Sequence, residues 1–148
     1  MTASGRNEGI ADNRLDPMAK PSPSRCLEDF HAHVIVDQEV RYTIVGGRFS
    51  PTARIDLTSQ LVILSVTAAN DFRLTLPVGS FRKTGLDGYI ASVQHGLLKT
   101  DILLQPLSSG DWAYSFGVDG FVPGSTPITV DLRIGSQAGR TTVNAYAF

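Results

Sequence analysis

The feature of the sequence that most limits its fold is a strict alternation of apolar and polar residues near the C-terminus. Segment 128–134 reads ITVDLRI, so every second residue is a branched aliphatic. Successive side chains of a β-strand point to opposite faces, so this spacing gives one apolar face and one polar face. The segment therefore predicts a half-buried strand of an antiparallel sheet.

The same signal recurs along most of the chain. Segments 40–44 and 72–78 also alternate, and the apolar run 61–66 is typical of a strand inside a sheet. Weaker strand patterns occur at about 88–94, 100–105, 111–117 and 140–147. Turn residues between the strands are found at Gly46-Gly47, Asn70-Asp71, Asp87-Gly88, Ser109-Gly110-Asp111 and 135–139. About 8–10 short strands with little or no helix predict an all-β sandwich or barrel.

The first 26 residues differ from the rest of the chain. They are rich in small and polar residues, contain three prolines and show no apolar period. We therefore predict a disordered polar tail over 1–26 and a single β-domain over 27–148. A chain of 148 residues with 42% hydrophobic and 18% charged residues is sufficient for one such core.

Charge and hydropathy argue against several kinds of partner. The formal net charge is -1 and no run of Lys or Arg occurs, so we expect neither nucleic-acid binding nor attraction to an anionic membrane. No stretch approaches the roughly 20 apolar residues that span a bilayer, and the first 30 residues lack the apolar block of a signal peptide. The single cysteine, Cys26, predicts an inert thiol and no disulfide framework.

Residue patterns typical of enzymes are missing from the sequence. It has no Gly-x-Ser-x-Gly elbow and no phosphate-binding or dinucleotide loop, and nothing in their spacing links His31, His33 or His95 to a nucleophile. We therefore predict no catalytic residue, no cofactor and no enzymatic activity.

His31 and His33 are the one pair with metal-ligand spacing. On a strand, residues i and i+2 point the same way and bring two imidazoles towards one ion. A third ligand would have to come from His95, Asp37 or Glu39 through the tertiary fold. The interpretation we favour is that both histidines lie on the outer face of an edge strand.

Trp112, Tyr114 and Phe116 lie at i, i+2 and i+4, so a strand would present all three rings on one face. Exposed, they would form an apolar platform on which a sugar stacks; buried, they would be a large part of the core. The core interpretation is favoured because the alternate residues of this segment are more polar.

The stretch from Arg54 to Phe148 resembles a β-sandwich repeat of uncharacterised bacterial, often exported, multi-repeat proteins. The resemblance rests on segments 55–60 (IDLTSQ) and 76–82 (LPVGSFR), and above all on 125–136 (STPITVDLRIGS) followed by 139–143 (GRTTV). It implies an immunoglobulin-like antiparallel sandwich and an extracellular or cell-envelope location. It implies no catalytic or binding residues.

These observations lead to one principal functional hypothesis and two alternatives. We expect a non-catalytic structural or protein-interaction module that presents loops or a sheet edge to another protein. The first alternative is a carbohydrate-binding domain that holds a polysaccharide on Trp112 and Tyr114, and the weaker one is a small metal-dependent hydrolase built on His31 and His33. The sequence does not specify the ligand or the oligomeric state.

Overall fold

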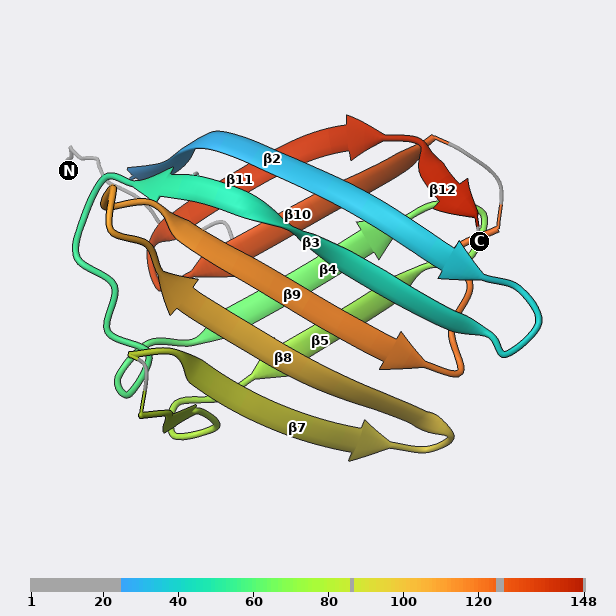
Figure 1. Cartoon of the computed structure of the whole chain (residues 1–148), viewed down its shortest axis with the longest axis horizontal. Coiled ribbons are helices and arrows are strands. Elements are labelled where there is room, and N and C mark those ends of the chain that lie inside the picture. The colour runs from blue at the N-terminus through green and yellow to red at the C-terminus, as the bar shows by residue number, and fades with distance from the viewer. Residues whose placement is uncertain (1–24, 86, 125–126, 148) are drawn as a thin grey trace, which may run out of the picture.

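A computed structural model describes residues 25–85, 87–124 and 127–147. These residues form strands and turns and contain no helix, which confirms the predicted all-β class. The strands, labelled as in Figure 1, are β2 (Arg25–Asp37), β3 (Tyr42–Pro51), β4 (Val62–Thr67), β5 (Phe72–Leu76), β6 (Arg82–Lys83), β7 (Tyr89–His95), β8 (Leu98–Pro106), β9 (Trp112–Asp119), β10 (Ile128–Ile134), β11 (Gln137–Val143) and β12 (Ala145–Ala147). Most of the predicted tail lies outside the described residues, but Arg25 and Cys26 belong to β2.

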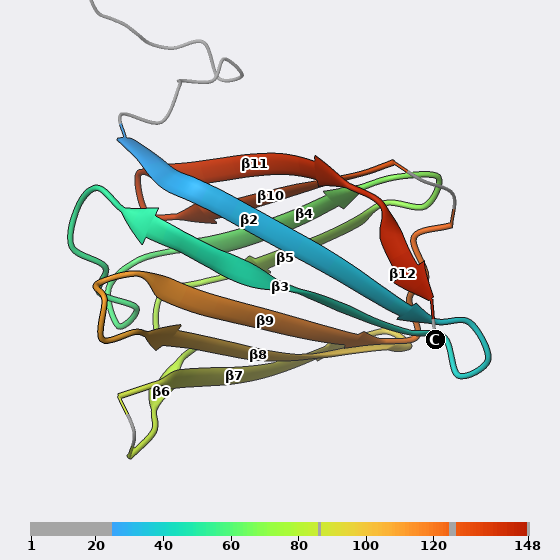
Figure 2. The same cartoon turned by 45° about the horizontal axis from the view of Figure 1, so that its top comes forward.

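All eleven strands belong to one sheet in the order β5-β4-β10-β11-β2-β3-β9-β8-β7-β6, with β12 beside β2. The sheet curls into a half-barrel, so that β4, β5, β10 and β11 face β2, β3, β9, β8 and β7 across the core (Figures 1 and 2). Neighbouring strands are antiparallel except at β2, which pairs in parallel with β11 and with β12. The expected antiparallel pairing therefore holds between β2 and β3 but fails on the other side of β2, because both C-terminal strands run in its direction.

The core lies between the two facing halves of the sheet. Every second residue of β10 is fully buried, as the alternation predicts, and the same holds for Val62 and Leu64 of β4. The opposite half contributes large side chains such as Phe49 and Phe116. Burial of alternate apolar residues from both halves is the main stabilising contribution of this fold.

In β3, the residues that face the core are not the ones that the alternation of segment 40–44 predicts. Tyr42 and Ile44 lie on the outer side, whereas Thr43 and Val45 are fully buried. The Thr43 hydroxyl is satisfied there, because it donates a hydrogen bond of 2.6 Å to the carbonyl of Phe121. Val40, expected in the same strand, is 63% exposed in the preceding turn.

The glycine pair Gly46-Gly47 lies inside β3, so the turn predicted there is wrong. A Cβ atom at Gly47 would overlap the main-chain carbonyl of His31 on β2. Glycine is needed at this point because two backbones approach closely, and such an approach is a common reason for glycine within a strand.

Strand β4 lies between β5 and β10, which confirms the prediction that segment 61–66 is inside the sheet. Only one of its faces is covered. Ile63 and Ser65 point away from the core and are half-buried, so the outer face of β4 and its neighbours is open to a ligand.

Candidate binding site

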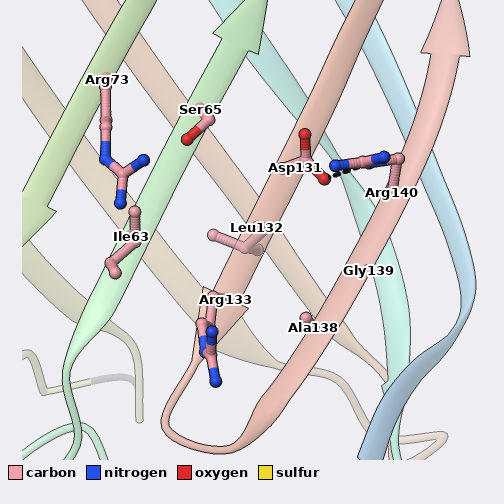
Figure 3. Close-up of a pocket in the computed structure, with 9 residues that line it drawn as sticks. All are labelled: Ile63, Ser65, Arg73, Asp131, Leu132, Arg133, Ala138, Gly139 and Arg140. Carbon is pink, nitrogen blue, oxygen red and sulfur yellow. Dashed lines mark hydrogen bonds and ion pairs between the residues drawn. The ribbon is translucent and has the colours of Figure 1, made fainter. Parts of the chain in front are cut away.

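A hollow of about 450 Å³ lies on the outer face of β5, β4, β10 and β11 (Figure 3). Its lining is about equally polar and apolar, and Ile63 forms part of its floor. The charged and hydroxyl-bearing residues that line it are Ser65, Arg73, Asp131, Arg133 and Arg140.

Strand register brings these residues together. Arg73 of β5 lies opposite Ser65 of β4, Ser65 lies opposite Asp131 of β10, and Asp131 lies opposite Arg140 of β11. Neighbouring strands are about 4.8 Å apart, so the four side chains form a line across four strands. Arg133 joins from the next row, where it lies opposite Ile63.

The carboxylate of the hollow is engaged by one arginine. The Nε atom of Arg140 donates a hydrogen bond of 2.5 Å to Oδ1 of Asp131, and Figure 3 shows the pair on adjacent strands. That hydrogen bond, together with the charge of Asp131, raises the pKa of Arg140 above its ordinary value. Asp131 therefore compensates the charge of Arg140. It does not compensate the charges of Arg73 and Arg133.

Arg73 and Arg133 have unused donors. Arg133 donates from Nε to the carbonyl of Gly135 at 3.2 Å, which leaves its terminal nitrogens available. Within the described part of the chain, Arg73 has no hydrogen bond and no ion pair. In Figure 3, the guanidinium group of Arg73 ends near Ile63, whereas the side chain of Arg133 extends away from Ile63 towards the turn between β10 and β11. This arrangement suits an oxyanion attached to an apolar stem.

A second hollow, of about 480 Å³, lies on the outer face of β3, β9, β8 and β7. The small residues Ser115 and Gly117 line it, and Tyr42 lies close against Gly117. Its carboxylate, Asp101, accepts a hydrogen bond of 2.9 Å from Ser92. This hollow is more apolar, and Arg82 is the cation in its lining, whereas three arginines line the first hollow.

The structure places His31 and His33 on one strand, β2, and His95 on another, β7. His31 and His33 are exposed on the outer side of β2, where they lie opposite Arg48 and Gly46, whereas the ring of His95 stacks on Phe72. No group of three or more His, Cys, Asp or Glu residues able to hold a metal ion occurs in the described ranges. The strand β2 has neighbours on both sides, so it is not the edge strand expected. Metal binding by this pair, the less favoured interpretation, stays an untested hypothesis.

The three aromatic residues of β9 point towards the core. Tyr114 is 3% exposed and Phe116 is fully buried, while Trp112 is half-buried and stacks on Tyr89 with ring centroids 6.0 Å apart. The outer side of this strand carries small residues, Ala113, Ser115 and Gly117. The three rings therefore do not form an exposed platform together.

The arginines of the first hollow were missed in the sequence because they are far apart along the chain. Each occupies a polar position of an alternating or weak strand, which by itself indicates only a solvated face. Pairing of β5, β4, β10 and β11 brings them together, and pairing is a property of the tertiary fold.

Comparisons with protein-family models, with curated proteins and with solved structures found no match. Among the described residues, no helix is long and apolar enough to cross a membrane. The resemblance to bacterial β-sandwich repeats therefore stays a hypothesis, and the function has to be argued from the surface itself.

Proposed function

We propose that this protein is a non-catalytic interaction module that binds another protein through the outer face of β5, β4, β10 and β11. The observation that carries the proposal is the hollow on this face, where Arg73 and Arg133 have donors that no carboxylate of the described residues occupies. Arginine is enriched at protein interfaces because its planar group makes several directed hydrogen bonds while its stem packs on apolar surface.

The distribution of charge supports this proposal. The lining of the hollow includes three arginines and one aspartate, although the whole chain carries a net charge of -1. A positive patch on a weakly acidic protein steers a complementary partner to one face and disfavours other orientations.

The finer structural class is part of the same proposal. We propose an immunoglobulin-like sandwich of the bacterial repeat type, acting in the cell envelope or outside the cell. It is supported by the two facing halves of the sheet and by the core between them, and by the resemblance of segments 55–60, 76–82 and 125–143.

Of the two alternatives, the carbohydrate-binding domain depends on an exposed aromatic strand face. Because Tyr114 and Phe116 are buried, no observation favours that surface, and we do not propose it. The metal-dependent hydrolase requires a third metal ligand that the tertiary fold brings close to His31 and His33. No observation favours such a ligand, and we do not propose this function.

Site-specific photo-crosslinking in producing cells tests the proposal. A photoreactive amino acid replaces Thr67, which is exposed beside the hollow, or Gln94, which is exposed on β7 in the opposite half of the sheet. We expect a discrete adduct with another protein from position 67 and none from position 94. Equal adducts from both positions would contradict the proposed face, and so would their absence from both. Turnover in a hydrolase screen that His31→Ala or His33→Ala abolishes would contradict the non-catalytic role.

A further inference from the structure

We infer that the hollow binds carboxylates from an acidic segment of the partner protein, one at Arg73 beside Ile63 and another at Arg133. The inference rests on the proposed function and adds the chemistry of the partner. It follows from the donors that the hollow offers, from their placement and from the residues that surround them.

The donors match a carboxylate. A guanidinium group is planar and presents parallel N–H groups that pair with both oxygens of a carboxylate. Arg73 has its whole guanidinium group available, and Arg133 has its terminal nitrogens available. A lysine-based site would offer point charges without this match in shape.

The placement of the two arginines allows them to act together. They extend from β5 and β10, which lie on either side of β4, and Arg133 lies two residues further along the strands than the row of Arg73, so their backbones are about 12 Å apart. Arg73 ends near Ile63, which projects from the strand between them, and Arg133 extends towards the β10–β11 turn (Figure 3). An Asp or Glu side chain that pairs with Arg73 would pack its methylene groups on Ile63, and a second acidic residue of the same segment would pair with Arg133.

The surroundings favour a protein segment over a polysaccharide or a nucleic acid. Sugar rings and bases are commonly held by stacking on aromatic side chains. The outward residues of these four strands in the described ranges are Ile63, Ser65, Thr67, Arg73, Thr75, Thr129, Asp131, Arg133, Ala138, Arg140 and Thr142, and none is aromatic.

Binding of a fluorescein-labelled hexaglutamate peptide at low ionic strength tests the inference. We expect saturable binding to the wild-type protein that weakens about tenfold in Arg73→Gln and in Arg133→Gln, since each variant loses charge-assisted hydrogen bonds. Arg54→Gln is the matched control, because it removes the same charge from an exposed loop outside the hollow and should leave the affinity unchanged. Far-UV circular dichroism verifies that each variant is folded.

Two competitors distinguish binding of an acidic peptide from binding of an acidic polysaccharide or a free oxyanion. Polygalacturonate and inorganic phosphate carry oxyanions without a peptide chain, and we expect neither to displace the peptide at an equal concentration of charge. Displacement by either one would overturn the inference, as would an equal loss of affinity in Arg54→Gln or no binding of the peptide. An adduct from position 67 in the crosslinking experiment would still support the proposed function in those cases, so the two failures are distinguishable.

Discussion

The phenolic hydroxyl of Tyr114 donates a hydrogen bond of 2.8 Å to the main-chain carbonyl of His31. Tyr114 lies on β9 and His31 on β2, and β3 lies between these strands. The contact passes over Gly47, whose missing side chain leaves room for both groups. The ring of Phe30, beside the bulge of β2, stacks on Tyr114 with centroids 5.5 Å apart. Three strands are thus joined by one buried tyrosine.

Replacing Tyr114 with Phe removes this hydrogen bond and retains the ring. We expect the free energy of unfolding to fall by about 1 kcal/mol, the typical net contribution of one intramolecular hydrogen bond. Urea denaturation followed by circular dichroism measures the change. Tyr42→Phe is the control, because the Tyr42 hydroxyl makes no hydrogen bond with any described residue. Equal effects of the two substitutions would contradict the role of the His31 contact.

Replacing Gly47 with Ala places a methyl group where the His31 carbonyl now lies. Because the obstacle is backbone, β2 and β3 would have to separate, and we expect a loss of about 2 kcal/mol or more. Thermal unfolding of Gly85→Ala gives the comparison, since a Cβ atom at Gly85 meets nothing within 4 Å. A Gly47→Ala variant as stable as Gly85→Ala would show that the close approach is not required.

Gln137 joins β11 to the segment that follows β3. Its side chain is 1% exposed; Oε1 accepts hydrogen bonds from the main-chain N–H groups of Thr52 and Ala53, at 2.8 and 3.1 Å, and Nε2 donates to the carbonyl of Ala53 at 3.0 Å. Gln137→Leu leaves these groups without partners, which we expect to cost about 3 kcal/mol. The exposed Gln94→Leu should change the free energy of unfolding by less than about 0.5 kcal/mol in the same denaturation experiment. A mild effect of Gln137→Leu would mean that water replaces the amide.

The stability of the fold should depend on pH through Asp111. Hydrogen bonds from Ser50, at 2.6 Å, and then from Arg48, at 2.7 Å, hold the pKa of Asp111 below its ordinary value of 3.8. A lowered pKa in the folded state stabilises the protein above the unfolded-state pKa, and this contribution disappears as the pH falls through the folded-state pKa. The difference in stability between the wild-type protein and Asp111→Asn should therefore be constant near neutral pH and shrink below about pH 4. A difference that stays unchanged down to pH 2 would contradict this assignment.

The sequence was sufficient to predict the strands whose alternation agrees with their burial. In β10 every apolar residue of the pattern faces the core, and so do the three apolar residues of β5, so local periodicity predicts both strands and their orientation; Val78, at the end of the predicted segment 72–78, lies beyond β5 and is 58% exposed. In β3 it does not, because the fold buries Thr43, whose hydroxyl finds the Phe121 carbonyl 78 residues away. Sequence periodicity contains no information about such a partner.

The glycines and arginines also show that local sequence patterns contain no information about tertiary contacts. Gly47 and Gly139 were interpreted as turn residues, yet both lie in strands, where the His31 carbonyl and the Phe30 ring respectively come too close for a side chain. Arg73 and Arg133 become neighbours only through the pairing of β5, β4 and β10. Contacts between segments distant in the chain determine these features, so local patterns could not have predicted them.

The proposed binding face is tested most directly by a map of amide chemical shifts in the ¹⁵N-labelled protein as hexaglutamate is added. We predict that the shifts concentrate in β4, β5, β10 and β11, with the largest changes near Ser65, Arg73 and Arg133, and that they vanish in the double variant Arg73→Gln/Arg133→Gln. Shifts concentrated in β7, β8 and β9, or shifts that persist in the double variant, would contradict the assignment of the binding surface.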